Sequence, residues 1–367
     1  MNSSKIKIKK LLNNKKFKKI FVITGKASFT KSGAKNFFEN LLFNKQVYFF
    51  FKQRNIPELN ELKKIIIKLR KFKPDLILAI GGGSVIDYAK MANVIEIKKN
   101  IKKLIRNYSY PIKKKFTKLA VIPTTAGSGA EVTSNAVVYV NSIKYSFENR
   151  LLIPDFFFLL PELVLNASNK IKASSGFDAI AQATESLLSI NSNRYSVNYA
   201  SKSLKISLKN FSGFLNNPNI ENSKRMLTAS NLAGKAINIS KTTAPHAISY
   251  PFTSLYNVSH GHAVSLFFEN IIKFNFNKIE MSSTKFDLRK RFKLIFDLYE
   301  VCNIDEFCLK LIKIKKMSRL SDNFKKLKIF KINPKKIING VNLLRLKNNP
   351  VKIDKIDLIK IINEKIL

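Results

Sequence analysis

The sequence is poor in the residues that build disulfide frameworks and cysteine-rich zinc sites. It contains no tryptophan and only two cysteines, Cys302 and Cys308, among 367 residues. Two cysteines six positions apart cannot form a disulfide framework, and no other cysteine is available to complete a zinc quartet. We therefore expect a reducing compartment, the cytoplasm, and interior positions for both cysteines.

Long apolar runs are also missing. The longest apolar block, residues 156–165, is interrupted by Pro161 and Glu162. It falls well short of the roughly 20 residues that a membrane span needs. Near the N-terminus, residues 20–24 form an apolar run that is too short for the core of a signal peptide, and it is predicted to be a β-strand. We expect neither a membrane span nor a membrane partner.

Acidic residues are scarce. The chain has 24 Asp and Glu and 66 Lys and Arg, which gives a formal charge of +42. Such a basic surface can bind nucleic acid by releasing counterions from phosphates. However, only 10 of the basic residues are arginine, and the lysines occur throughout the chain instead of forming one arginine-rich groove. This pattern indicates an A+T-rich coding sequence and a solvated lysine surface, so nucleic acid is not expected as a partner.

The N-terminal part of the chain alternates between strand and helix patterns. Strands are predicted at residues 19–24, 47–51, 75–80 and 119–122, and helices at residues 31–42, 57–71 and through Asp87 and Lys90. Such alternation indicates parallel strands joined by crossover helices. From about Ala167 onward, apolar residues recur at intervals of three and four, which indicates helices. We expect an α/β domain over residues 1–166 and an all-helical domain over residues 167–367.

Two glycine-rich loops in the α/β part are typical of phosphate binding. The first, GGGS at residues 81–84, lies between a predicted strand and a helix, where backbone N–H groups can approach a diphosphate. It lacks the GxGxxG spacing, so by itself it is also consistent with a tight structural turn. The second, PTTAGSGAEVT at residues 123–133, follows another predicted strand and adds hydroxyls and glycines. Two such loops in one α/β unit predict a nucleotide site.

A carboxylate and an amide precede two of the three histidines in the chain. Asp178 and Gln182 are four residues apart and so lie on one face of a predicted helix, and His246 and His260 follow downstream. This set predicts a divalent-metal site. Structural alternatives stay open: Asp178 can cap a helix, Gln182 can be solvated, and the histidines can be buried hydrogen-bonding residues.

These motifs resemble those of the iron-containing alcohol dehydrogenases. The matching segments are GGGSVIDYAK (81–90), PTTAGSGAEVT (123–133), GFDAIAQATES (176–186) and HAISYPFTSLYNVSHGHAV (246–264), in the family's order over residues 18–275. The resemblance implies a Rossmann-like dinucleotide-binding domain and an all-helical domain, as in dehydroquinate synthase, with the metal in the cleft between them. It also implies an NAD(P)-dependent oxidoreductase that interconverts a small aldehyde and its alcohol.

Carried over residue by residue, the resemblance implies a cofactor site and a metal site. The cofactor would be held by Gly82, Gly83, Ser84, Asp87, Thr124, Thr125, Ser128 and Lys144, and the metal by Asp178, Gln182, His246 and His260. NAD-preferring members place an aspartate after the first strand, where this chain has Gly25 followed by Lys26, so NADPH is favoured over NADH. Iron(II) is the metal that the resemblance implies. Gln182 replaces one of the family's three histidines and shifts the ligand set toward oxygen donors, so zinc and manganese are alternatives.

A second departure from the family concerns the proton path. Many members have a histidine where this chain has Tyr250, and His262 is an additional histidine two residues after His260. Tyr250 and His262 are therefore the candidate catalytic side chains for protonation, alongside water and the cofactor ribose. His262 is also a candidate for contact with an anionic substrate group.

The substrate is suggested by finer features of the same motifs. Gln182 and the phrases HAISYPFTS and HGHAV look like the branch that reduces phosphonoacetaldehyde to 2-hydroxyethylphosphonate, a step in phosphonate biosynthesis. The alternatives are a reductase of another small aliphatic or hydroxyaldehyde and a non-catalytic polycationic scaffold. Retention of the phosphate-loop glycines argues against the scaffold. A small aldehyde or alcohol is the expected partner, and a homodimer is left open.

Overall fold

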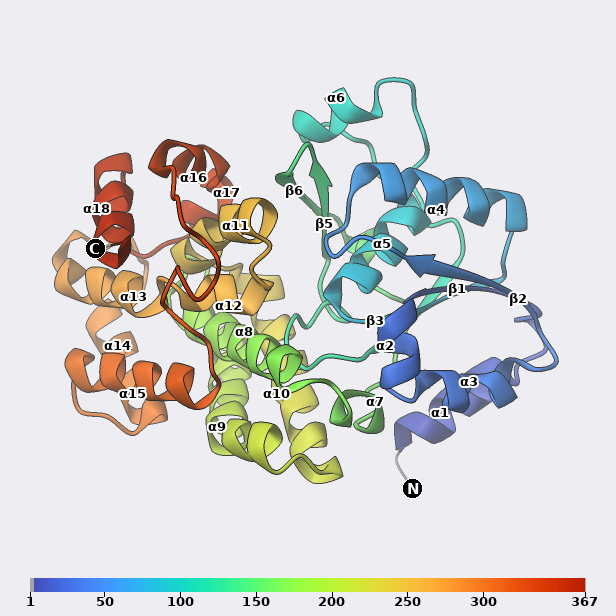
Figure 1. Cartoon of the computed structure of the whole chain (residues 1–367), viewed down its shortest axis with the longest axis horizontal. Helices are drawn as coiled ribbons and strands as arrows, with labels where there is room; N and C mark the ends of the chain where they lie inside the picture. The colour runs from blue at the N-terminus through green and yellow to red at the C-terminus, as the bar shows by residue number, and fades with distance from the viewer. Residues whose placement is uncertain (1–2, 367) are drawn as a thin grey trace. The chain divides into compact units, whose positions relative to one another are not determined.

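The computed structural model describes residues 3–366, and the chain divides into two compact units (Figure 1). The N-terminal unit contains Met1–Ser168 and Asn219–Leu227, and the C-terminal unit contains Asn169–Pro218 and Thr228–Leu367. Among residues 3–366, no helix combines the length and the apolar character that crossing a membrane requires.

The N-terminal unit is built on a five-stranded parallel sheet (Figure 1). In spatial order its strands are β2 (Gln46–Lys52), β1 (Lys19–Gly25), β3 (Leu76–Gly81), β4 (Lys118–Pro123) and β7 (Phe156–Phe157). β1, β3 and β4 are buried almost throughout, which explains why their sequences are continuous apolar runs. The chain turns from β2 back to β3 on the other side of β1. In such sheets, ligands bind beyond the carboxyl ends of the strands at this reversal.

Helices cover both faces of this sheet. They are α1 (Ser3–Leu12), α2 (Lys26–Lys31), α3 (Ala34–Leu42), α4 (Leu59–Phe72), α5 (Gly83–Val94), α6 (Ile101–Arg106) and α7 (Glu162–Leu165), with a 3₁₀ turn at Arg150–Leu152. Successive residues of β3 point to opposite faces, so Ile77 packs in a core with α4 and α5 while Leu78 packs in a core with α1 and α3. The α/β fold predicted from the sequence is confirmed.

Two local predictions in this unit need correction. The helix expected over residues 31–42 begins later, as α3 at Ala34, and a separate helix that was not predicted, α2, ends at Lys31. Gly33, whose φ of 82° lies in the left-handed region, separates the two helices. The antiparallel hairpin of β5 (Asn135–Val140) and β6 (Ile143–Glu148) was not predicted. Asn141 and Ser142 form its turn with φ values of 52° and 63°, as a two-residue type I′ turn requires.

The C-terminal unit is helical, as expected, and one helix, over residues 220–240, belongs to the N-terminal unit up to Leu227 and to the C-terminal unit from Thr228. The helices from residue 169 onward are α8 (Asn169–Leu188), α9 (Arg194–Asn216), α10 (Ile220–Ser240), α11 (Ala244–Tyr256), α12 (His260–Ser265), α13 (Phe268–Asn277), α14 (Leu288–Tyr299), α15 (Ile304–Met317), α16 (Pro334–Gly340), α17 (Leu343–Leu346) and α18 (Lys355–Ile366), with a 3₁₀ turn at Ile279–Met281. α8 is buried along most of its length and packs against α9 and α12. Polar residues on α8 therefore lie inside the unit, where each needs a partner.

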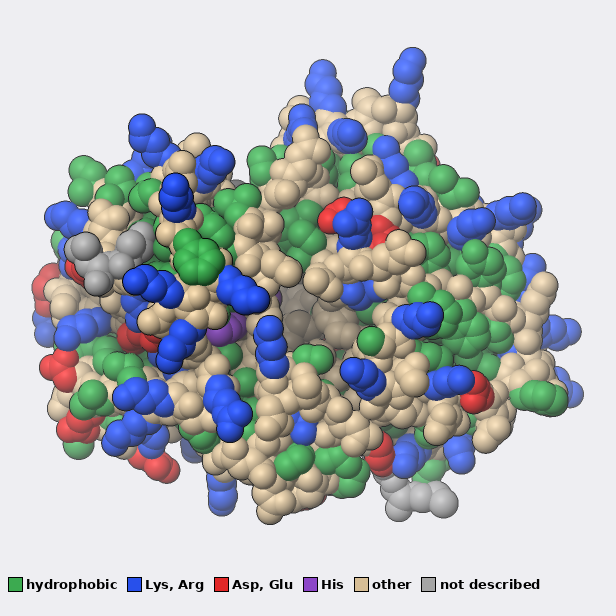
Figure 2. Space-filling view, viewed as in Figure 1, with side chains coloured by type: hydrophobic (Ala, Val, Ile, Leu, Met, Phe, Trp, Pro, Cys, Tyr) green, Lys and Arg blue, Asp and Glu red, His purple; other side chains and the backbone are tan. Residues whose placement is uncertain are grey.

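The surface agrees with the composition. Figure 2 shows lysine and arginine side chains scattered over the visible face of both units, without a single basic groove on that face. The expectation for the cysteines was wrong for Cys302, which is exposed, while Cys308 is half-buried. Neither cysteine is paired in a disulfide.

Candidate metal and cofactor sites

The two glycine-rich loops meet at the carboxyl end of the sheet in the N-terminal unit. β3 ends at Gly81 and α5 begins at Gly83, while the loop at residues 123–133 continues from the neighbouring strand β4. Thr124 donates its backbone N–H to the carbonyl oxygen of Gly81 at 3.1 Å. This bond extends the pairing of β3 with β4 into the loops. Both glycine-rich loops are therefore held at the same edge of the sheet.

The glycines allow the close approach of these loops. A Cβ atom on Gly82 would lie 3.2 Å from Oγ1 of Thr125, and one on Gly83 would lie 3.0 Å from Oγ of Ser128. Both distances are tighter than ordinary van der Waals contact, so side chains here would push the hydroxyl-bearing loop away from the start of α5. The residues present therefore form a cradle of hydroxyls and a helix N-terminus that fits a diphosphate.

α5 also carries two charged side chains, the buried Lys90 and the half-buried Asp87. Lys90 is fully buried and its Nζ donates to the carbonyl oxygen of Thr133 at 2.8 Å and to that of Asn135 at 3.0 Å. These bonds fix the end of the 123–133 loop. Burial raises the pKa of Asp87 to about 6, and the positive charges of Lys90 and Lys144 act in the opposite direction. The β5–β6 hairpin thus brings Lys144 within electrostatic reach of Asp87.

Gly25 lies at the carboxyl end of β1, opposite Lys52 on β2. A Cβ atom on Gly25 would lie 2.9 Å from Oγ of Ser28 and 3.9 Å from Cε of Lys52. Burial lowers the pKa of Lys52, and Glu61 partly offsets this. Sequence reasoning missed Lys52, because only the strand pairing places it beside Gly25.

In the C-terminal unit, three of the four predicted metal ligands come together. Asp178 comes from the middle of α8, His246 from the first turn of α11 and His260 from the first residue of α12. One ligand atom from each lies within 4.8 Å of the others. Nε2 of His246 is 3.2 Å from Oδ1 of Asp178, and the two imidazole centroids are 5.3 Å apart.

Gln182 is the fourth predicted metal ligand, and its contacts indicate whether the site fits a cation. Its Nε2 donates to Oδ2 of Asp178 at 3.1 Å, while its buried Oε1 has no hydrogen-bond partner among the described residues. An unsatisfied buried oxygen costs about 1–3 kcal/mol, and a bound cation would remove that cost. Asp178 lies mid-helix and Gln182 is only 3% exposed, so helix capping and solvation do not account for them. The residues present fit a divalent metal.

Two carboxylates act on His246. Its Nδ1 contacts Oε2 of Glu185, and its Nε2 faces Asp178. Burial lowers the pKa of His246, but the negative charges of Glu185 and Asp178 outweigh it and raise this pKa to about 10. Both ring nitrogens of His246 thus face carboxylates, and a metal that binds Nε2 requires that nitrogen to be unprotonated. Sequence reasoning missed Glu185, although its position seven residues after Asp178 places it on the same helix face.

The two candidate proton donors have different surroundings. The ring of Tyr250 lies 5.9 Å from that of His260, centroid to centroid, and Tyr250 is buried. His262 donates from Nε2 to the carbonyl oxygen of Ser321 at 2.9 Å, and burial lowers its pKa. Residues two apart do not share a helix face, so His262 is not directed to the same side as His260. Tyr250 is the candidate that lies against a predicted metal ligand.

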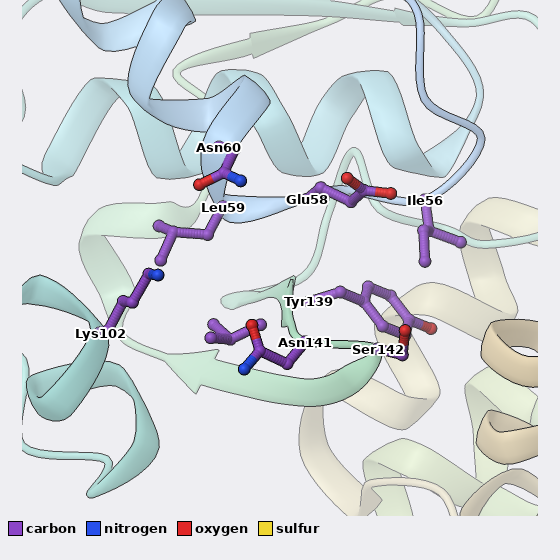
Figure 3. A pocket seen from close by; sticks show the side chains of 9 residues that line it. Ile56, Glu58, Leu59, Asn60, Lys102, Tyr139, Asn141 and Ser142 are labelled. Atoms are coloured by element: carbon purple, nitrogen blue, oxygen red, sulfur yellow. The ribbon is translucent and has the colours of Figure 1, made fainter.

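The N-terminal unit also contains a pocket of about 210 Å³ (Figure 3). It is lined by Ile56, Glu58, Leu59, Asn60, Lys102, Tyr139, Val140, Asn141 and Ser142. The start of α4 and the turn of the β5–β6 hairpin form its walls, and Tyr139 donates its backbone N–H to the carbonyl oxygen of Pro57 at 2.7 Å. None of the site residues predicted from the sequence lines this pocket.

Two family models match the chain, one in each half. A model described as "Iron-containing alcohol dehydrogenase" matches residues 3–161. A second, described as "Fe-containing alcohol dehydrogenase family, C-terminal", matches residues 172–365. The second match alone covers more than half of the chain.

Curated relatives match over part of their length. The 4-hydroxybutyrate dehydrogenase of Clostridium kluyveri is 30% identical over 213 residues, which is 55% of this chain and 55% of the relative. The aldehyde-alcohol dehydrogenase of Streptococcus pneumoniae is 28% identical over 245 residues, which is 63% of this chain and 28% of the relative. The chain thus spans between about a quarter and about half of the length of these relatives.

Solved structures match over nearly the whole chain. The sulfoacetaldehyde reductase from Bifidobacterium kashiwanohense, in complex with NAD+, has a TM-score of 0.86 at 23% identity and covers 99% of this chain and 95% of its own. An archaeal halo-thermophilic alcohol dehydrogenase from a Red Sea brine pool has a TM-score of 0.88 at 19% identity with the same coverage. At these identities the likeness shows the fold.

Proposed function

Because the chain belongs to the iron-containing alcohol dehydrogenase family, we propose that it is a metal-dependent aldehyde reductase that uses NADPH or NADH. The observation that carries this proposal is the meeting of Asp178, His246 and His260 beside Gln182, whose Oε1 has no hydrogen-bond partner in the described part of the chain. A scaffold without catalysis would have no use for a buried amide oxygen that lacks a partner. Iron(II) is the metal we propose, with zinc or manganese as alternatives.

We propose that the C-terminal unit binds the metal and that the N-terminal unit binds the cofactor. Asp178, Gln182, His246 and His260 would hold the metal, and the loops around Gly82 would hold the cofactor diphosphate. When bound, the metal supplies a Lewis acid for the aldehyde oxygen and the reduced nicotinamide supplies the hydride. Tyr250, whose ring lies 5.9 Å from that of His260, is our candidate for delivering a proton to the product oxygen through its hydroxyl.

We propose an aldehyde with an anionic group, phosphonoacetaldehyde, as the substrate. Gln182 and the HAISYPFTS and HGHAV phrases support this choice. Asp322 and the two lysines Lys170 and Lys315 act on His262 with opposite signs, so the charges around that histidine do not by themselves select an anion. The Bifidobacterium kashiwanohense protein of similar fold is named for another two-carbon aldehyde with an acidic group. A second candidate is another small aliphatic aldehyde. The Clostridium kluyveri relative is named for 4-hydroxybutyrate, whose alcohol corresponds to an aldehyde that also carries an acidic group.

The substrate proposal predicts a ranking. Phosphonoacetaldehyde is expected to exceed propanal in kcat/KM by about tenfold or more, because a charge-assisted hydrogen bond contributes about 1.5–3 kcal/mol. Sulfoacetaldehyde should fall between them if charge alone decides. Since Nε2 of His262 already donates to Ser321, a contact with the phosphonate would fall to Nδ1, and His262→Ala should then lower kcat/KM for phosphonoacetaldehyde more than for propanal. Loss of the Ser321 bond affects both substrates equally, so propanal is the internal control. Equal or faster turnover of propanal by the unmodified protein would leave the general aldehyde reductase as the better account.

The cofactor proposal predicts a preference for NADPH, since no acid at position 25 repels a 2′-phosphate and Lys52 lies beside that position. Gly25→Asp should shift the ratio of kcat/KM values toward NADH by about tenfold or more, because the new carboxylate can accept ribose hydroxyls. The new Cβ meets only the Ser28 hydroxyl closely, and that hydroxyl can rotate. Gly25→Ala is the matched control for size without charge. An unmodified protein that prefers NADH would contradict the proposal.

A further inference from the structure

Glu185 is a fully buried carboxylate in the C-terminal unit. It lies on α8, seven residues after Asp178 and three after Gln182, so the three side chains share one face of the helix. Burial of a carboxylate is costly unless its oxygens are hydrogen-bonded. The partners of Glu185 therefore indicate its role.

The two oxygens of Glu185 have different partners. Oε1 accepts from the backbone N–H of Thr243 at 2.9 Å, from the Thr243 hydroxyl at 3.0 Å and from the backbone N–H of His246 at 3.3 Å. These bonds satisfy the start of α11, where backbone N–H groups have no partners within the helix. Oε2 contacts Nδ1 of the His246 imidazole and leaves Nε2 facing Asp178.

We infer that Glu185 is a positioning residue for the metal site, because it sets both the rotation and the tautomer of His246 so that Nε2 faces the metal. The inference rests on the proposed function. One carboxylate fixes the start of α11 against α8 and determines which nitrogen of His246 is available. Loss of the oxygen acceptor behind a metal-binding histidine typically lowers metal affinity about 10–100-fold.

Glu185→Gln separates these roles, because the carboxamide has almost the same size but only one oxygen. If that oxygen stays on the donors of Thr243, the amide NH₂ faces Nδ1 and requires it to be unprotonated. The ring proton then lies on Nε2, the nitrogen that must bind the metal. If the amide flips, its NH₂ group faces the N–H donors of α11 and those hydrogen bonds are lost. The first arrangement therefore loses the metal-binding tautomer of His246, and the second loses hydrogen bonds at the start of α11.

The experiment is a titration of the metal-free full-length protein with Co²⁺, followed by visible absorption. We expect Glu185→Gln to raise the Co²⁺ dissociation constant about 10–100-fold. Thr243→Val is the matched control, because it removes only the hydroxyl bond to Oε1. It should lower the Tm of the metal-free protein without changing the Co²⁺ dissociation constant. Equal dissociation constants for Glu185→Gln and the unmodified protein would overturn the inference.

A second measurement needs no variant of Glu185. In the unmodified protein, ¹⁵N-labelled histidine signals recorded with Zn²⁺ should show Nε2 of His246 bound to metal and Nδ1 protonated. Metal bound at Nδ1 would overturn the inference. Neither measurement uses an aldehyde or a nicotinamide cofactor. A protein that binds Co²⁺ through His246 as expected but reduces no aldehyde would therefore support the role of Glu185 and contradict the proposed reductase activity.

Discussion

Replacing Asp178 with alanine is expected to abolish metal retention and to lower aldehyde reduction by about a thousandfold or more. Asp178 is the only carboxylate in the proposed ligand set, and it faces His246 at 3.2 Å and Gln182 at 3.1 Å. Lewis-acid activation contributes several kcal/mol, and each 1.36 kcal/mol corresponds to about tenfold in rate. Metal analysis of the purified protein and the rate of NAD(P)H oxidation are the measurements.

The fold should persist in the Asp178→Ala protein, because Glu185 still pairs with His246 and still caps α11. Circular dichroism and the Tm check this point. Asp297→Ala is a suitable control, since Asp297 is an exposed aspartate on α14 in the same unit. His260→Ala should repeat the result of Asp178→Ala from a different helix. Undiminished turnover by either metal-free variant would remove the metal from the mechanism.

The parallel sheet was predictable because buried strands such as β3 are continuous apolar runs that end in glycine. The β5–β6 hairpin was not, since its turn depends on left-handed conformations at Asn141 and Ser142 that many residue pairs avoid. The break at Gly33 was missed for a related reason. The helical pattern of apolar residues continues across it, and one glycine in such a pattern does not reveal its φ.

The metal site shows what spacing reveals and what it does not. Helix geometry places Asp178 and Gln182 on one face, and the same rule would have added Glu185. The approach of His246 and His260 depends on how α11 and α12 pack on α8, which no local pattern contains; the family's motifs supplied that expectation. Lys52 could not be found from the sequence, because its place beside Gly25 follows from the register of β1 and β2.

Gly261→Ala is expected to have the second large effect, because it adds a carbon where α12 packs closely on α8. Gly261 follows His260 in α12, and a Cβ atom there would lie 1.9 Å from the carbonyl oxygen of Ser174 and 2.9 Å from Cβ of Asp178. Neither atom is the end of a flexible side chain, so α12 must move. We expect a loss of about 1–3 kcal/mol in stability from overpacking. Turnover should fall about a hundredfold, since a displacement of about 1 Å near the reacting groups can have that effect.

Ser259→Ala is the matched control for this prediction. Ser259 precedes His260, and its buried hydroxyl has no hydrogen-bond partner among the described residues, so its removal adds no volume and breaks no bond. This variant should keep the Tm, the metal content and the turnover of the unmodified protein. The two variants differ in whether a carbon is forced between α8 and α12. Gly261→Ala could instead retain both its metal and its Tm. In that case the close packing of α12 on α8 would not be what holds the ligands together. The site would then depend on the contact between Glu185 and His246 alone.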